Sequence, residues 1–256
     1  HEFVVNRIIP SGFFKTSLPI AVIAGGAGFI GSYLCRSLLS KNIKVVCMDN
    51  LQTGSGENAQ DLLENKNFFL LESDINKSLP KNITKVDYVI HLAGAEAHLN
   101  SEDVSIEVLE ANSIGCKNLL SLAQGNQARF LLASANGSEG YFGKTRQEEV
   151  NFSHKEAKRF AEALVSEYFQ KKGVDARIMR LGDVYGPGMP LSSGNILADL
   201  IKQFLYNKPI VVPNNNQVNL YPVFVQDVVE GIEKSLFASG TRGAVISLAG
   251  AKISVF

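Results

Sequence analysis

The feature that most constrains this chain is a glycine-rich run, GGAGFIGS, at residues 25–32. A short apolar segment precedes it, and a segment with apolar residues at helical spacing follows it. Gly25, Gly28 and Gly31 then have separate tasks: a tight turn, close approach of phosphate groups to the backbone, and close packing of the helix on the strand. The start of such a helix offers unpaired N–H groups and a positive dipole end to an anion. The run therefore predicts a dinucleotide site between a strand and a helix.

The rest of the chain alternates short apolar runs with segments at helical spacing. We expect strands at residues 20–24, 43–48, 67–71, 86–92, 129–133 and 176–181, and helices at residues 30–39, 104–123 and 155–171. Continuous apolar strands separated by helices indicate a parallel sheet that is covered on both faces. The expected fold class is therefore α/β, a doubly wound parallel sheet of the Rossmann type.

The last third of the chain changes character. We expect a helix at residues 191–205, a strand at 209–213, an extended segment at 218–224 and a helix at 225–237. These elements predict a small lobe at the carboxyl edge of the sheet, where ligands of such sheets bind. The expected division is a dinucleotide-binding domain at residues 19–184 and a smaller substrate-binding lobe at 185–256, partly interleaved with the first domain.

Two acidic residues at strand ends bear on the choice of dinucleotide. Asp49 closes the second expected strand, where a carboxylate accepts hydrogen bonds from both adenosine ribose hydroxyls and repels a 2′-phosphate. That placement favours NAD over NADP as the cofactor. Asp74 follows the third expected strand, at the adenine edge of the site. The alternative interpretation is that the glycines only form a turn and that Asp49 caps a helix.

Composition argues against several other classes of protein. The chain has 25 basic and 25 acidic residues, so neither nucleic acid nor an anionic membrane is expected as its partner. It has no apolar run of the ~18 residues that a membrane helix needs. Cys35, Cys47 and Cys116 are scattered, which indicates reduced thiols and a cytoplasmic protein. The four histidines have no metal-ligand spacing, so we expect no metal site.

Several motifs together resemble a known family. They are the glycine run at 25–32, DNLQTG at 49–54, DI at 74–75, HLAG at 91–94, KRFAE at 158–162, YGP at 185–187 and FVQDV at 224–228. With these motifs the chain resembles the extended short-chain dehydrogenase/reductases, and among them the NAD-dependent epimerase/dehydratase branch. The nearest pattern is that of the UDP-glucuronate decarboxylases. The resemblance covers the chain from about residue 19 to its end.

The resemblance implies a tightly held NAD and a nucleotide sugar, most readily a UDP-sugar, as substrate. Enzymes of this family oxidise a sugar hydroxyl transiently and then epimerise, eliminate or decarboxylate. The family also implies a homodimer that pairs the helices at 104–123 and 155–171. The residues that would contact the cofactor are Gly25, Gly28, Phe29, Ile30, Gly31, Asp49, Asn50, Thr53, Gly54, Asp74, Ile75, Leu92, Ala93, Gly94, Lys158 and Val184.

The catalytic residues implied by the family are only partly present. The family uses a tyrosine as general base four residues before a lysine; here Lys158 matches the lysine and His154 stands in place of the tyrosine. Helical spacing puts both side chains on one face, and a neutral imidazole is a proton acceptor. We therefore assign His154 and Lys158 as candidate catalytic residues. The alternative is that His154 is a partly exposed helix residue without a chemical role.

The serine or threonine that the family places after the fifth strand has two candidates. Counting forward from the strand, the position falls on Ala135, beside Ser134; counting back from the tyrosine at 141, it falls on Ser138. The two counts differ because the loop has extra residues, so Ser134 and Ser138 both remain candidates.

Two further departures concern substrate binding. Asp183 stands where the branch often has an asparagine near the substrate diphosphate, and an added negative charge there is repulsive unless paired. Leu220 stands where an arginine often binds the phosphates, so a bidentate anion clamp is missing there. The chain ends at Phe256, earlier than the family's full length, so part of the lobe is expected to be absent or differently built.

The sequence thus supports an NAD-dependent enzyme that acts on a nucleotide sugar, with HxxxK in place of YxxxK. A second hypothesis is a catalytically silent, NAD-binding member of the family that acts as a sensor or an assembly subunit. A third is a reductase of small carbonyl compounds.

Overall fold

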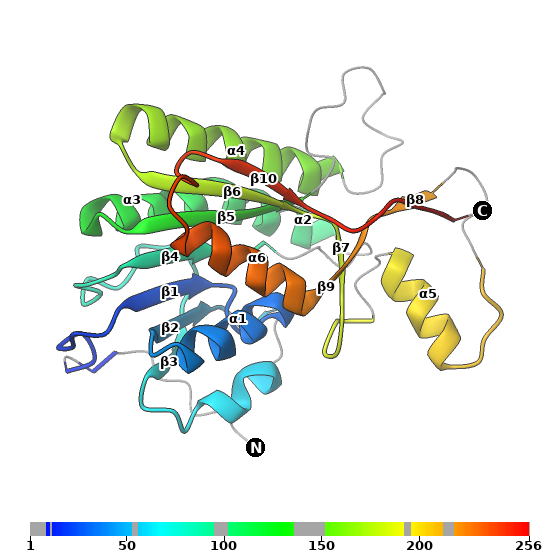
Figure 1. Cartoon of the computed structure of the whole chain (residues 1–256), viewed down its shortest axis with the longest axis horizontal. Coiled ribbons are helices and arrows are strands. Elements are labelled where there is room, and N and C mark those ends of the chain that lie inside the picture. The colour runs from blue at the N-terminus through cyan, green and yellow to red at the C-terminus, as the bar shows by residue number, and fades with distance from the viewer. Residues whose placement is uncertain are drawn as a thin grey trace.

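The structure is a computed structural model, and it describes residues 9–10, 12–52, 56–94, 102–135, 152–191, 196–211 and 218–255. Its centre is a seven-stranded sheet in the order β10-β6-β5-β4-β1-β2-β3, with parallel pairing throughout (Figure 1). The strands are β1 Ile20–Ala24, β2 Lys44–Asp49, β3 Phe68–Glu72, β4 Tyr88–His91, β5 Arg129–Ala135, β6 Asp175–Leu181 and β10 Val245–Leu248. The expected doubly wound α/β class is confirmed.

Two layers of helices cover the sheet (Figure 1). One face carries α1 Phe29–Ser40 and α6 Val225–Phe237, whose apolar residues join the core that includes Leu34 and Val228. The other face carries α3 Cys116–Asn126 and α4 Phe152–Lys172, whose core includes Leu119 and Val165. Every residue of β1 and β2 is buried, because helices cover both sides of these strands. A 3₁₀ helix, η1 Gly56–Leu62, follows β2.

The expected continuous helix at 104–123 is wrong in one respect. The structure has α2 Glu102–Glu110, then a π-helical turn, η2 Ala111–Gly115, and then α3. The Ala111 carbonyl accepts a hydrogen bond from the Cys116 N–H and lies 3.1 Å from His91 Nε2. A π turn adds a residue to the helical repeat, and such turns occur mostly at functional sites. The buried side chain of His91, at the end of β4, contacts the first residue of this π turn.

A segment before the first strand contributes to the core. Ile9, Phe13 and Phe14 are buried, and Phe13 packs edge-on against Phe69 of β3. Lys44 of β2 is also buried, and its Nζ donates to the Phe13 carbonyl at 2.7 Å. The resemblance begins only near residue 19, so family motifs did not indicate this packing.

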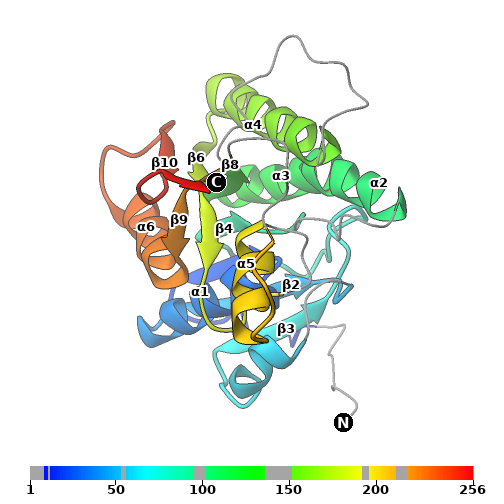
Figure 2. The same ribbon diagram turned by 90° about the vertical axis from the view of Figure 1, so that its right-hand side faces the viewer.

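The smaller elements lie beyond the carboxyl ends of the strands (Figure 2). They are α5 Ile196–Leu205, the parallel pair β7 Asp183–Tyr185 and β9 Pro222–Phe224, and the antiparallel pair β8 Val218–Leu220 and β11 Ile253–Val255. In the described residues α5 spans Ile196–Leu205, and Leu191, where the expected helix starts, lies in a turn; residues 192–195 lie outside the described residues. Residues 209–211 of the expected strand at 209–213 form no strand. Residues 212 and 213 lie outside the described residues. In the described part of the chain, no helix combines the length and apolar character needed to cross a membrane.

Candidate functional site

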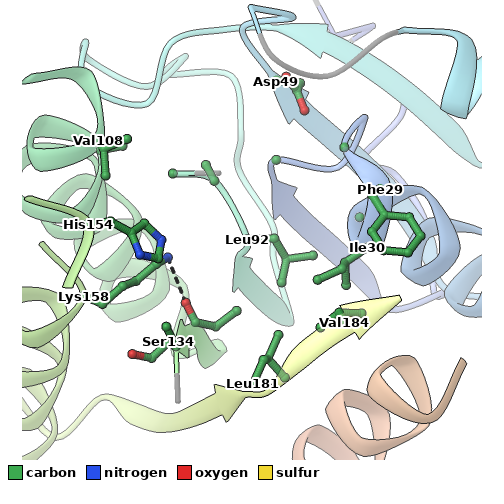
Figure 3. A pocket seen from close by; sticks show the side chains of 18 of the residues that line it. Phe29, Ile30, Asp49, Leu92, Val108, Ser134, His154, Lys158, Leu181 and Val184 are labelled. Atoms are coloured by element: carbon green, nitrogen blue, oxygen red, sulfur yellow. Dashed lines mark hydrogen bonds between the residues drawn. The ribbon is translucent and has the colours of Figure 1, made fainter. Parts of the chain in front are cut away.

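A cavity of about 800 Å³ opens at the carboxyl ends of the central strands (Figure 3). It is lined by the segment after β1 and by the segment after β4, the two strands between which the order of the sheet reverses. The crevice at such a reversal is where doubly wound sheets bind their ligands. The position of the cavity therefore follows from the topology.

The glycine loop forms one wall of this cavity. Gly25 has φ +80°, and a β-carbon there would lie 2.7 Å from the Ala93 nitrogen. Gly28 is the N-cap residue of α1, and in the described structure no side chain caps the N–H groups at that helix end. The bare backbone and the unpaired N–H groups fit the phosphate groups of a dinucleotide. The site is thus suited to the cofactor that the family implies.

Asp49, the last residue of β2, lines the cavity beside the glycine loop. It is 7% exposed; its Oδ2 accepts from the Ala27 N–H and its Oδ1 from the Leu51 N–H, both at 2.9 Å. Burial raises the pKa of this carboxyl, and the N–H donors act in the opposite direction. Asp49 therefore braces the glycine loop, and it also lines the cavity, where ribose hydroxyls are suitable further donors.

The cavity brings together nearly all of the residues that the sequence nominated. Those predicted to contact the cofactor and found in its lining are Gly25, Gly28, Phe29, Ile30, Gly31, Asp49, Asn50, Asp74, Ile75, Leu92, Ala93, Gly94, Lys158 and Val184. The candidate catalytic residues His154 and Ser134 also line it. Thr53, Gly54 and Ser138 lie outside the described residues.

Lys158 and His154 both enter the cavity from α4 (Figure 3). Lys158 is 6% exposed, and its Nζ donates to the Ala133 carbonyl at 3.1 Å. Burial lowers the pKa of His154 to about 4, with further contributions from the charges of Lys158 and Lys155. The His154 imidazole is therefore neutral at neutral pH, with a nitrogen lone pair that can accept a proton.

Ser134 lies in β5, beside the carbonyl that holds Lys158. Ser134 is 3% exposed, and its Oγ has no hydrogen-bond partner within the described part of the chain. A buried hydroxyl without a partner costs about 1–3 kcal/mol, so such a group usually faces a ligand or an ordered water. Ala135, the other residue at this position, has no polar side chain. Ser134 is thus the described candidate for contact with a reacting oxygen.

The sequence did not nominate several lining residues on the other side of the cavity. They are contributed by α2 and by the segments around β7, β8 and β9: Glu107, Val108, Glu110, Met189, Pro190, Asn219 and Tyr221. Asp183 also lines the cavity, and its Oδ2 accepts from the Tyr221 N–H at 2.6 Å. Leu220 is buried in β8 between two lining residues. No local pattern marks these residues, because tertiary contacts bring separate segments to one place.

The charges of the described lining are unequal. Lys158 is the one lysine or arginine among the described residues that line the cavity. The carboxylates in the described lining are Asp49, Asp74, Glu107, Glu110 and Asp183. The missing arginine at Leu220 is therefore not replaced by another described cation of the wall.

The chain matches the model of the NAD dependent epimerase/dehydratase family over residues 21–248. It is 31% identical over 244 residues to UDP-glucuronic acid decarboxylase 2 of Arabidopsis thaliana, a match that covers 89% of this chain and 54% of that protein. It is also 31% identical over 221 residues to UDP-glucuronic acid decarboxylase 1 of Xenopus tropicalis, covering 82% and 52%. The chain thus spans about half the length of these relatives.

Solved structures show the same similarity. UDP-glucuronic acid 4-epimerase from Bacillus cereus, in complex with UDP-glucuronic acid and NAD, superposes with a TM-score of 0.79 at 25% identity, covering 92% of this chain and 79% of that one. dTDP-glucose 4,6-dehydratase from Bacillus anthracis, in complex with NAD, gives a TM-score of 0.77 at 22% identity, with coverage of 92% and 77%. The second likeness supports the fold alone.

Proposed function

Because this chain belongs to the NAD dependent epimerase/dehydratase family, we propose that it is an NAD-dependent enzyme that modifies a nucleotide sugar, a UDP-sugar, through transient oxidation of a sugar hydroxyl. One observation carries the proposal: a single cavity joins the glycine loop and Asp49 to the polar group of His154, Lys158 and Ser134. The names of the relatives and the UDP-glucuronic acid complex of the Bacillus cereus epimerase support the substrate class.

The glycine loop and the acidic residues would hold the cofactor. The backbone at Gly25 and Gly28 would receive the phosphates, Asp49 the ribose hydroxyls, and Asp74 the adenine edge. When bound, NAD supplies a hydride acceptor beside the substrate. The proposed preference for NAD over NADP rests on the carboxylate of Asp49, which repels a 2′-phosphate.

His154 would take the proton of the reacting hydroxyl, in the role that the family gives to a tyrosine. Its lowered pKa keeps the imidazole neutral and available, but it also makes His154 a weaker base than free imidazole. Ser134 Oγ would donate a hydrogen bond to the reacting oxygen, which would give this buried hydroxyl a partner. Lys158, whose Nζ donates to the Ala133 carbonyl, would orient the nicotinamide ribose. Its ammonium would also stabilise negative charge that develops on the reacting oxygen of the sugar.

The test is turnover by the purified protein with NAD and a panel of UDP-, GDP- and dTDP-sugars, followed by NMR. Product formation that falls at least a hundredfold in the His154→Ala variant is the expected result. Turnover that appears only in the His154→Tyr variant would mean that the active site has lost its base. Binding of NAD without turnover by either protein would favour the silent NAD-binding hypothesis over the enzyme.

We also propose a homodimer, formed by α2 and α4. Ile106, Leu109 and Ile114 of the α2–η2 segment and Phe160 of α4 are exposed, and α2 packs beside α4. Exposed apolar side chains on adjacent elements are typical of an interaction surface. Phe160→Glu is expected to give a monomer in light scattering after gel filtration, whereas Phe204→Glu, at a more exposed site on α5, should leave the dimer intact.

The domain division at residues 19–184 and 185–256 stays a proposal, supported by the cavity wall that both parts supply. The cytoplasm is the proposed compartment, and three buried cysteines without disulfides in the described structure support it.

A further inference from the structure

A short turn, which we call the 186–190 turn, borders the cavity after β7. Met189 and Pro190 of this turn line the cavity. The Met189 N–H donates to the Gly186 carbonyl at 3.2 Å, so the turn is closed on itself. A displacement of the 186–190 turn would therefore move part of the cavity wall.

The turn is joined to α1 by one tyrosine. The Tyr33 hydroxyl donates to the Pro187 carbonyl at 3.0 Å. The Tyr33 ring lies one helical turn beyond Phe29, and the two rings meet edge to face with their centroids 6.0 Å apart. Phe29 lines the cavity at the start of α1. Tyr33 thus connects the 186–190 turn to α1, whose first residues line the cavity.

Arg36 fixes a third segment at the same place. Its guanidinium carbon lies 6.0 Å from the centre of the Tyr33 ring, and Nη2 donates to the Asn58 carbonyl at 2.6 Å. The same guanidinium is paired with Asp61, so it anchors η1 to α1. A β-carbon on Gly188 would lie 3.7 Å from Asn58 Oδ1, so the 186–190 turn and η1 are neighbours.

Two glycines with positive φ flank Pro187 in the 186–190 turn. Gly186 has φ +152° and Gly188 has φ +82°, one on each side of Pro187. These are conformations that residues with side chains rarely adopt. The Pro187 carbonyl therefore sits between the two positions of the turn where the backbone rotates with least steric cost.

We propose that the hydrogen bond from Tyr33 to Pro187 is a latch, which holds the 186–190 turn closed and sets the rate at which the dinucleotide enters and leaves. Tyr33 is then a positioning residue, because it acts through the turn and not on the reacting atoms. The inference rests on the NAD binding in the proposed function and adds the element that controls exchange.

Tyr33→Phe removes the hydroxyl and keeps the ring contacts with Phe29 and Arg36. The net contribution of one hydrogen bond, about 0.5–1.5 kcal/mol, corresponds to a change of about twofold to tenfold. A weakened latch opens more often, so the association and dissociation rates of NADH should both rise by about that factor. The equilibrium dissociation constant should change by less than about twofold.

Stopped-flow measurement of NADH fluorescence on the full chain gives both rates, and the chain has no tryptophan to interfere. The matched control is Tyr206→Phe, a hydroxyl deletion at an exposed tyrosine beyond α5, which should leave both rates unchanged. Thermal melting confirms that each variant is folded.

Unchanged rates in Tyr33→Phe would overturn the latch. Faster dissociation with an unchanged association rate would also overturn it, because that result describes a lost binding contact and not a gate. Failure of the unmodified protein to bind either NADH or NAD would instead overturn the proposed function, and the latch with it. If the unmodified protein binds NADH but the Tyr33→Phe rates are unchanged, only the latch is overturned, and NAD binding in the proposed function stands.

Discussion

At Gly31, a β-carbon would lie 2.2 Å from the Gly25 carbonyl oxygen and 2.7 Å from the Gly26 Cα. Both of these neighbours are backbone atoms, so no side-chain rotation relieves the contact. The closeness of α1 to the loop that precedes it thus depends on one missing carbon. The same loop supplies the cavity wall that fits phosphate groups, so packing and ligand binding are coupled at this residue.

Gly31→Ala is therefore expected to weaken NAD binding by at least about a hundredfold, because the loop must move away from the ligand. Isothermal titration calorimetry measures the effect. The control is Gly125→Ala in α3, where a β-carbon would meet no atom within 4 Å. That variant should bind NAD normally and gain up to about 1 kcal/mol of stability, since alanine favours helices. Normal binding by Gly31→Ala would contradict the assigned role of the loop.

Asp183 places a negative charge in the wall of the cavity. It adds a carboxylate to a wall whose one described cation is Lys158. Asparagine keeps an oxygen that can accept from the Tyr221 N–H and removes the charge. Asp183→Asn should therefore bind UDP about three- to tenfold more tightly, as measured by calorimetry with NAD present. Asp199→Asn on α5 is the control for overall charge. Equal affinities in all three proteins would show that Asp183 does not face the anionic part of the ligand.

At the scale of elements, α4 carries Lys158 and His154, and its position on the sheet decides where they point. Glu162, one turn beyond Lys158, forms an ion pair with Arg180 of β6, with Nη2 2.8 Å from Oε2 and Nε 3.0 Å from Oε1. Both side chains are largely buried, and three hydrogen bonds join the guanidinium to the carboxylate. The pair thus fixes α4 against the sheet close to the candidate catalytic residues.

Breaking that pair should be costly. Glu162→Gln removes the negative charge of this largely buried pair and is expected to lower the free energy of unfolding by about 3 kcal/mol, as urea denaturation would measure. Glu167→Gln on the same helix loses an ion pair with Lys171 that is exposed, so its cost should stay below about 1 kcal/mol. Similar losses in the two variants would mean that the Glu162–Arg180 pair does not anchor α4.

For the whole molecule, two histidines couple stability to pH: His91, which is buried, and His154, which is half-buried. Burial lowers the pKa of His91 to about 3 and that of His154 to about 4, and in both cases the charge of Lys158 adds to the effect. The unfolded chain binds protons at these groups below about pH 6.5, whereas the folded chain does not until much lower pH. The folded state is therefore not penalised by these groups above pH 6.5, and it loses stability as the pH falls toward 4 for His154 and toward 3 for His91.

The expected result is a loss of stability at ~1.4 kcal/mol per pH unit for each group, from pH 6.5 down to about 4 for His154 and about 3 for His91. Urea denaturation at several pH values measures it. His91→Asn does not titrate in this range and should flatten the dependence, even if it lowers stability at pH 7. An unchanged slope in that variant would contradict the assignment of His91 as a neutral buried imidazole.

Much of the fold could be predicted from the sequence, because its signals are local. The glycine run, the apolar strands and the helix at 225–237 follow from steric limits on the backbone and from the periodicity of burial. Strand β10 was not predicted, since four residues with alternate exposure give a weak pattern. The π turn was not predicted either, because no pattern of residue types in 111–115 marks it, and its contact with His91 comes from a distant strand.

The sequence by itself determined the glycine loop, the doubly wound sheet and the acidic residue at the end of the second strand. These features depend on residue types at fixed spacing along one stretch of chain. Only the tertiary structure decided that the Ser134 hydroxyl is buried in the described cavity without a partner, that His154 is neutral beside Lys158, and that Tyr33 holds the 186–190 turn. Desolvation, charge proximity and long-range hydrogen bonds depend on which segments meet in space, and the spacing of residues along a chain does not specify that.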